Sequence, residues 1–194
     1  MIETEHKHFL LYKPYGYLSQ FINNGPKKNT KKLLGELYKF PEETMAIGRL
    51  DEDSEGLLLL TTDGKVSYEI CSGAIEKEYY VQVDGLITED AIENLQLGVE
   101  IGYSGKKYQT KPCHAFLLNE TPKLPERAKK IRDSRHGPTS WISITLTEGK
   151  FRQVKKMTAA VGFPTLRLAR VRIGNLHVDA MQAGEVIPTE NLLV

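Results

Sequence analysis

The most distinct hydrophobic pattern in the chain is a run of four leucines, Leu57 to Leu60, between polar turns. Gly56 precedes the run and Asp63-Gly64 follows it, and both residue types tolerate turn conformations. A short apolar run between turn signals is typical of a strand buried on both faces. We therefore expect a buried strand here that ends in a tight turn at Asp63-Gly64.

Other segments alternate apolar and polar side chains, which is the pattern of a half-buried strand. Within KEYYVQV, Tyr79, Val81 and Val83 fall on one face. Gly149 follows another alternating run, WISITL, and the arginine-rich PTLRLARVRIG begins at Pro164. Strands are expected at residues 7–12, 77–83, 141–146 and 164–174, with two more between residues 99 and 118.

Helical periodicity falls between these strands. Thr30 is expected to cap a helix with Leu33, Leu34 and Leu37 on one face, and Thr88 a second helix. A short helix is expected over residues 65–71. A fourth helix is predicted over residues 150–161, with an apolar stripe made of Val154, Met157, Ala160 and Val161.

The composition of the 194 residues is that of an ordinary globular protein, with 40% hydrophobic and 26% charged residues. The formal net charge of +1 favours no partner by itself, so RNA affinity would come from local Lys and Arg clusters. Cys71 and Cys113 make no disulfide framework, and no apolar run approaches the ~20 residues of a membrane span. We expect a cytoplasmic protein that does not enter a membrane.

Residues 119–139 are rich in Pro, Lys and Arg and poor in large apolar side chains. A loop of this length within a compact domain is usually functional or disordered. We interpret it as an RNA-facing excursion, with an unstructured surface loop as the alternative. Its basic residues are Arg127, Lys129, Lys130, Arg132 and Arg135.

The segment before the leucine run reads GRLDEDSEG, and its charge pattern alone indicates a solvated acidic loop. GRLD, GLLLL and T-x-D-G in this order, however, resemble the catalytic segment of the ribosomal RNA pseudouridine synthases. KPYG, KEYYV and EGKFRQVKKM resemble further motifs of that family. The resemblance runs in order from Tyr12 to about Val178, and such context gives a motif its force.

The resemblance implies three catalytic residues. Asp51 corresponds to the essential aspartate, Tyr79 to the tyrosine that stacks on the target base, and Lys150 to the cation that keeps the aspartate ionised. A carboxylate serves as nucleophile or as base toward the sugar, and the sequence leaves both roles open. Isomerisation of uridine involves no redox change, so we expect no cofactor and no metal.

Phosphate contacts are expected from the basic residues around these motifs. The target uridine must leave its stack, at a cost that phosphate contacts and base stacking offset. Lys13 has an equally simple structural interpretation as part of a rigid turn. The RNA-binding candidates are Arg49, Lys13, Arg152, Gln153, Lys155, Lys156, Arg167 and Arg170.

The implied fold is α+β, with a mixed, mainly antiparallel central sheet flanked by helices and an active-site cleft across it. We expect one catalytic domain over residues 1–194, without an N-terminal accessory RNA-binding domain. The expected substrate is a uridine of large-subunit (23S) ribosomal RNA, naked or in an assembling particle, modified by a monomer. The alternatives are a non-catalytic RNA-binding protein of ribosome assembly and an enzyme of small nucleosides or sugars.

Overall fold

The computed structural model describes residues 5–23 and 31–192, and within them the chain forms two compact units. Unit 1 consists of residues 1–75, 125–128 and 173–194. Unit 2 consists of residues 76–124 and 129–172. The expectation of one catalytic domain over the whole chain stays a prediction.

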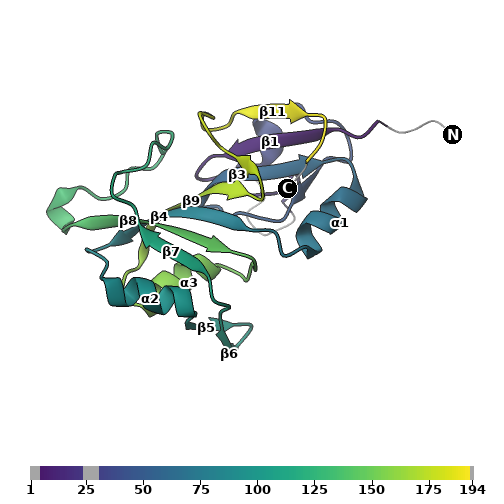
Figure 1. Ribbon diagram of the computed structural model, residues 1–194. Helices are drawn as coiled ribbons and strands as arrows, with labels where there is room; N and C mark the ends of the chain where they lie inside the picture. The colour runs from purple at the N-terminus through teal and green to yellow at the C-terminus, as the bar shows by residue number, and fades with distance from the viewer. Residues whose placement is uncertain (1–4, 24–30, 193–194) are drawn as a thin grey trace. The chain divides into compact units, whose positions relative to one another are not determined.

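The leucine run forms a strand of unit 1 that has neighbouring strands beside it (Figure 1). Strand β1 pairs antiparallel with β3 on one side and with β11 on the other, and β2 also pairs antiparallel with β3. Every residue of β3 is buried, which confirms the predicted strand buried on both faces. The strands of unit 1 are β1 (His8–Lys13), β2 (Met45–Ile47), β3 (Glu55–Thr61), β10 (Leu176–His177) and β11 (Val186–Thr189).

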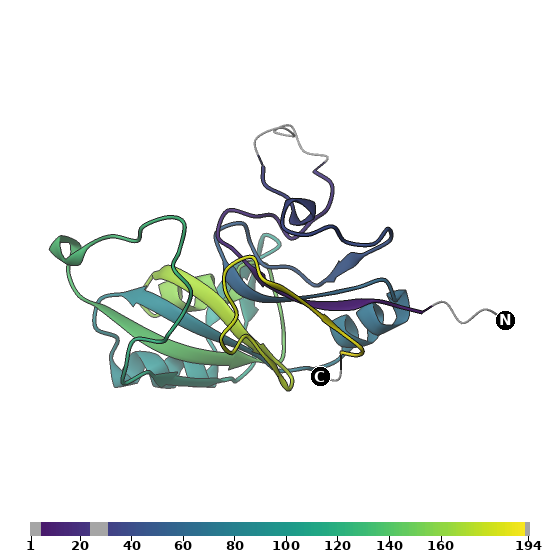
Figure 2. The ribbon, with the colours of Figure 1, turned by 90° about the horizontal axis from the view of Figure 1, so that it is seen from above.

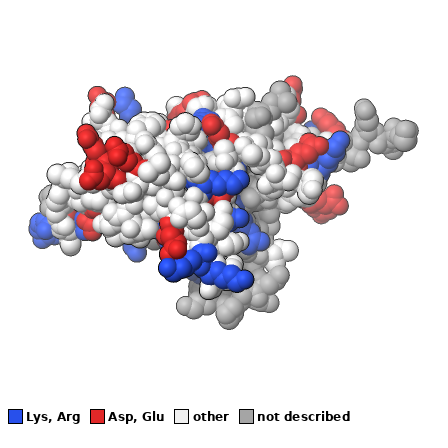
Figure 3. Space-filling view, turned by 60° about the horizontal axis from the view of Figure 1, so that its bottom comes forward, with Lys and Arg blue, Asp and Glu red and all other residues white. Residues whose placement is uncertain are grey.

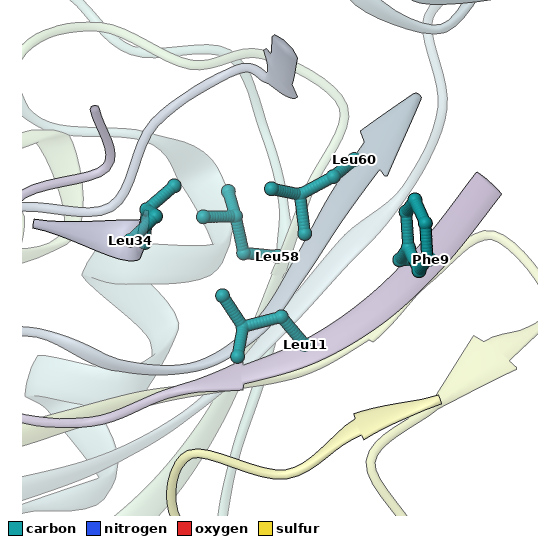
Figure 4. Close-up of a cluster of buried hydrophobic side chains, with 5 residues drawn as sticks. All are labelled: Phe9, Leu11, Leu34, Leu58 and Leu60. Atoms are coloured by element: carbon teal, nitrogen blue, oxygen red, sulfur yellow. The ribbon is translucent and has the colours of Figure 1, made fainter. Parts of the chain in front are cut away.

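A cluster of buried apolar side chains, shown in Figure 4, fixes β1 against β3. Phe40 adds an edge-on contact to the ring of Phe9, with ring centroids 5.4 Å apart. Burying an aliphatic or phenyl side chain contributes about 1.5–3 kcal/mol each. The members of this cluster are Phe9, Leu11, Leu34, Leu58 and Leu60.

The Asp63-Gly64 pair begins a helix instead of closing a tight turn. The Asp63 carboxylate accepts hydrogen bonds from the amides of Lys65 and Val66, so Asp63 is the N-cap of α1 (Gly64–Ser72). A side-chain cap satisfies amides that the first helical turn leaves without partners. The helix ends at Ser72, one residue beyond the predicted range, with Gly73 as its C-cap.

The helix expected after Thr30 shrinks to a single 3-10 turn, η2 (Leu34–Glu36). The Leu18 amide donates to the Lys32 carbonyl, and the Leu34 amide donates to Gln20. These bonds hold the chain before η2 alongside residues 17–20. A longer helix would need the Lys32 carbonyl for a hydrogen bond within the helix. Thr30 itself lies outside the described residues.

In unit 2, β8 (Thr139–Leu146) lies between β4 (Lys77–Asp84) and β7 (His114–Leu117), antiparallel to both. Strand β9 (Thr165–Ile173) neighbours β4 on its other side. Helices α2 (Glu89–Leu97) and α3 (Gln153–Ala160) lie on one face of these strands (Figures 1 and 2). The α+β class with antiparallel strand pairing is confirmed.

Residues 99–118 form three strands where two were expected. The first two, β5 (Glu100–Tyr103) and β6 (Lys106–Gln109), make a separate hairpin, and the third is β7. Residues 119–133 contain neither strand nor helix, and one 3-10 turn, η3 (Ser134–His136), follows (Figure 2). Nowhere in the described residues is there a helix long and apolar enough to span a bilayer.

Candidate active site

In unit 1, Asp51 lies in the turn that leads from Leu50 into β3. The Ser54 amide donates to the Asp51 carbonyl over 3.0 Å, which closes this turn. Leu50 before it and Ser54 after it are buried, whereas Asp51 is partly exposed. The backbone is therefore anchored on both sides of a carboxylate that solvent reaches.

The segment that carries the KPYG motif holds this turn from the side. The Ser19 hydroxyl accepts a hydrogen bond from the Leu50 amide (2.9 Å) and donates one to the Leu50 carbonyl (2.8 Å). The Gly16 amide donates to the carbonyl of Glu52 over 2.7 Å, and Gly16 has a φ of 87°. The positive φ favours glycine at this position. Two motifs far apart in sequence thus meet in unit 1.

Lys13 is fully buried at the end of β1, and its ammonium donates to the carbonyls of Pro14 (2.9 Å) and Tyr17 (2.7 Å). Burial lowers the pKa of Lys13 to about 7, although Glu55 and, more weakly, Asp53 and Asp51 raise it again. The ammonium is thus part of a rigid turn, the second of the two interpretations given to Lys13, and its contact with phosphate stays a prediction. Its charge acts on the acidic turn.

Two arginines of the basic excursion, Arg127 and Arg132, contact other protein side chains. The Arg127 side chain is 11% exposed, with Nε 3.2 Å from a carboxylate oxygen of Glu55, which is 1% exposed. Its guanidinium lies 4.1 Å from the ring centroid of Tyr15. Arg132 pairs with Asp84 in unit 2. These contacts turn two of the five predicted RNA-facing residues toward the protein.

A cavity of about 310 Å³ adjoins the Arg127–Glu55 pair in unit 1. Glu55 is the last acidic residue of the GRLDEDSEG segment, so this cavity lies next to the acidic turn. Its lining consists of Pro14, Tyr15, Glu55, Glu126, Arg127, Ala128 and Ala183.

In unit 2, Tyr79 lies on β4 opposite Ile144 of β8 and is 9% exposed. Its face of the strand is the buried one, as the alternation predicted, and Val81 and Val83 share it. On the other face, Glu78 accepts hydrogen bonds from Ser143 (2.8 Å) and Arg172 (2.9 Å). The backbone of Tyr79 is therefore fixed by the sheet.

Lys150 lies in a turn between β8 and α3, and the helix begins three residues later than expected. The Lys150 amide donates to the side-chain carbonyl of Gln153 (2.8 Å), whose NH₂ group donates to Glu148 (2.6 Å). Arg152 has a φ of 53°, in the left-handed region. Gln153 is buried and its side-chain amide holds the turn, and its contact with RNA stays a prediction.

Two tyrosines of the β5–β6 hairpin surround the Lys150 ammonium. The ammonium lies 5.4 Å from the ring centroid of Tyr103 and 5.1 Å from that of Tyr108, which favours the cation. The Tyr108 hydroxyl donates to Glu148 over 2.5 Å. Burial alone would raise the pKa of Glu148, but hydrogen bonds from Tyr108, the Lys111 amide and Gln153 lower it, and the Lys150 charge adds to them.

The other RNA-binding candidates differ in exposure. Arg49 is exposed, Arg152, Lys155 and Arg167 are partly exposed, and Arg170 is buried, at 3% exposure. The phosphate contact expected of Arg170 stays a prediction. Lys156, also partly exposed, donates to the Gly102 carbonyl (2.7 Å). Figure 3 shows Lys and Arg side chains in small groups with acidic groups among them.

Asp51 and Lys13 belong to unit 1, and Tyr79, Lys150 and the late basic residues belong to unit 2. Three residues of these surroundings were missed in the sequence: Ser19, Tyr103 and Tyr108. The position of Ser19 inside the KPYG-containing segment was the one indication in the sequence that it lies near the site. No pattern near Tyr103 or Tyr108 indicated a contact with Lys150.

Comparison with known proteins identifies what this chain resembles. The family model described as RNA pseudouridylate synthase matches residues 7–160. Ribosomal large subunit pseudouridine synthase E of Xanthomonas axonopodis pv. citri (strain 306) is 41% identical over 175 residues, covering 89% of this chain and 88% of that protein. The protein of the same name from Vibrio vulnificus (strain CMCP6) is 39% identical over 184 residues, covering 94% and 74%.

Solved structures agree. A crystal structure of a pseudouridylate synthase matches with a TM-score of 0.74 at 27% identity, covering 95% of this chain and 70% of that chain. Human RNA pseudouridylate synthase domain containing 1 matches with a TM-score of 0.54 at 15% identity, covering 86% and 74%. The second likeness concerns the fold alone.

Proposed function

The chain belongs to the RNA pseudouridylate synthase family and is an isomerase that acts on RNA, and from this premise we propose that it converts one uridine of large-subunit ribosomal RNA to pseudouridine with Asp51 as the catalytic carboxylate. The names of its relatives support the substrate class, since they are called ribosomal large subunit pseudouridine synthases. The proposed enzyme works as a monomer in the cytoplasm, on naked RNA or on an assembling particle.

The observation that carries the proposal is the way unit 1 presents Asp51. Ser19 fixes Leu50 through two hydrogen bonds and Gly16 fixes Glu52 through one, so the backbone on both sides of Asp51 is held. A reacting group gains rate from such fixed orientation. The side chain remains partly exposed, as a residue that meets a large substrate must be.

The reaction breaks the bond between N1 of the base and C1′ of the ribose and then joins C1′ to C5. The hydrogen on C5 leaves, and N1 gains a proton, so atoms and electrons balance without a redox partner or cofactor. A carboxylate serves such a reaction as nucleophile or as base toward the sugar. Asp51 takes one of these two roles.

Tyr79 and Lys150 complete the proposal from unit 2. Tyr79 provides a ring for the extruded base, and β4 and β8 fix its backbone. Lys150 provides a cation whose position is set by the tyrosine rings of the β5–β6 hairpin. Both assignments derive from the family motifs and are tested by substitution.

The decisive experiment measures tritium release from ribosomal RNA whose uridines carry tritium at C5. The Asp51→Asn variant should release none under single-turnover conditions while folding and binding RNA like the wild type. Asp53→Asn, two residues along the same turn, is the matched control and should keep its activity. Comparable release by wild type and Asp51→Asn would refute the assignment.

The target uridine is found by mapping pseudouridine across ribosomal RNA from cells that lack this protein. One site lost from the large-subunit RNA, and restored by the wild type but not by Asp51→Asn, is the expected result. Loss of a site from another RNA, with none lost from the large subunit, would overturn the substrate assignment.

A further inference from the structure

Phe151 is an exposed aromatic side chain in the turn between β8 and α3. It is 66% exposed, whereas Gln153 and Val154, which follow it in the chain, are each 4% exposed. Single exposed apolar side chains are common and need no explanation by themselves. The construction of this turn is what distinguishes Phe151.

The turn holds Phe151 outward through strained and buried groups. Arg152, the next residue, has a φ of 53°, which non-glycine residues seldom adopt. The side chain of Gln153 bonds both the Lys150 amide and Glu148, which closes the turn beneath Phe151. Left-handed conformations outside glycine concentrate at ligand-binding and active sites. The hydrogen bonds of this turn therefore stabilise a backbone conformation in which the phenyl ring of Phe151 is exposed to solvent.

A lysine ammonium lies over this ring. The Lys156 ammonium lies 5.4 Å from the ring centroid of Phe151 and is held there by the Gly102 carbonyl at 2.7 Å. Gly102 belongs to β5, so the β5–β6 hairpin lies beside the turn, and its exposed Lys106 and Lys107 add positive charge. Glu100 pairs with Lys107 across the hairpin over 2.8 Å.

We propose that Phe151 and Lys156 form a stacking platform for an unpaired nucleobase of the RNA substrate, with the lysines of the β5–β6 hairpin beside the phosphate backbone. Aromatic side chains within basic surfaces bind single-stranded RNA in this way, because every base offers a π face. A ring with a cation already over it also favours the electron-rich face of a base. The proposal deepens the proposed function, because it takes RNA as the substrate.

The experiment measures binding of a single-stranded RNA that carries 2-aminopurine, whose fluorescence falls on stacking. Phe151→Ala removes one base stack, so it should bind the RNA about tenfold more weakly than the wild type, within the range for such platforms. It should also abolish the fluorescence change. Phe151→Trp should restore both. Phe116→Ala on β7 is the matched control, since Phe116 is 51% exposed in the same unit, and it should bind like the wild type.

Equal affinity and equal fluorescence change in Phe151→Ala and the wild type would overturn the proposal. So would an equal loss in Phe116→Ala, because exposed aromatics in general would then account for the effect. Tritium release separates the two proposals. A wild type that binds and quenches without releasing tritium refutes the proposed function alone, whereas a Phe151→Ala variant that releases tritium and binds normally refutes the platform alone.

Discussion

The hydroxyl of Ser19 bonds both backbone groups of Leu50, accepting from the amide at 2.9 Å and donating to the carbonyl at 2.8 Å. Leu50 immediately precedes Asp51, and Ser19 is itself buried. The Ser19 hydroxyl therefore satisfies both backbone groups of Leu50, as the backbone of a neighbouring strand would do in a sheet. It fixes the peptide from which the proposed catalytic carboxylate projects.

Ser19→Ala should lower both the stability of the protein and the rate of the reaction. The Leu50 amide and carbonyl would lose their shared partner in a buried place, and an unsatisfied buried group costs about 1–3 kcal/mol. Urea denaturation measures the first effect, and single-turnover tritium release at saturating RNA measures the second.

Ser19→Thr keeps the hydroxyl and separates positioning from packing. This variant should restore most of the rate that Ser19→Ala loses. If Ser19→Ala lost stability but reacted at the wild-type rate, the hydroxyl would be a structural group without influence on Asp51.

Local patterns predicted those elements whose causes are local. The leucine run gave β3, the alternation from Lys77 gave β4, and Thr88 caps α2 by accepting from the Ala91 amide. Each of these features depends on residues that are close together in the sequence. The late start of α3 escaped prediction because the Gln153 side chain folds back onto the Lys150 amide, a contact that apolar periodicity does not reveal.

The charged partner of Lys13 and Arg127 could not be predicted, because Glu55, which acts on both, lies far from each of them in sequence. A lysine in a Lys-Pro turn is ordinarily solvated, yet Lys13 is buried among backbone carbonyls and near the acidic turn. Arg127 stands in a basic, proline-rich stretch that resembles an RNA-binding loop. Its partner Glu55 is buried beneath it and comes from a different motif.

Lys13 should make stability depend on pH in the alkaline range. Its pKa falls from the ordinary value of 10.5 to about 7 in the folded protein, chiefly through burial. Between these two values the unfolded chain holds a proton that the folded chain has lost, so stability rises with pH across this window. Below pH 7 both states are protonated, and this contribution becomes constant.

Urea denaturation of the wild type and of Lys13→Met from pH 6 to pH 10 checks this. The wild type should gain stability relative to Lys13→Met between about pH 7 and pH 10. Lys65→Met replaces an exposed lysine of α1 and should follow the wild type at every pH. Parallel curves for the wild type and Lys13→Met would show that Lys13 titrates normally.

Lys150 and Lys155 should separate into a catalytic and a binding role. Lys150→Met should lower the single-turnover rate strongly and leave the salt dependence of RNA binding nearly unchanged. Lys155→Ala should weaken binding of all RNA sequences and flatten the plot of log affinity against log salt by somewhat under about one unit, the share of one phosphate. Two equivalent surface lysines would instead give equal losses of affinity and unchanged rates at saturating RNA.

The buried Arg127–Glu55 pair should matter for stability, whereas the exposed Arg135–Asp133 pair in the same excursion should not. Removing one partner of a buried pair leaves a buried charge and costs about 3–5 kcal/mol. Arg127→Met should approach the lower end of this range, because Lys13 remains close enough to Glu55 to feel its charge. Arg135 is 84% exposed, so solvent screens its interaction, and Arg135→Ala should leave the urea midpoint almost unchanged.

A double-mutant cycle separates the ion pair from the packing of Arg127 on Tyr15, whose ring centroid lies 4.1 Å from the guanidinium. If the ion pair dominates, Arg127→Met combined with Glu55→Gln should cost less than the sum of the single changes, because each single variant leaves a buried charge without its partner and the double variant leaves none. If stacking dominates, Tyr15→Leu should cost as much as Arg127→Met and the cycle should show additivity. An additive cycle with a harmless Tyr15→Leu would mean that neither contact fixes the Arg127 side chain within unit 1.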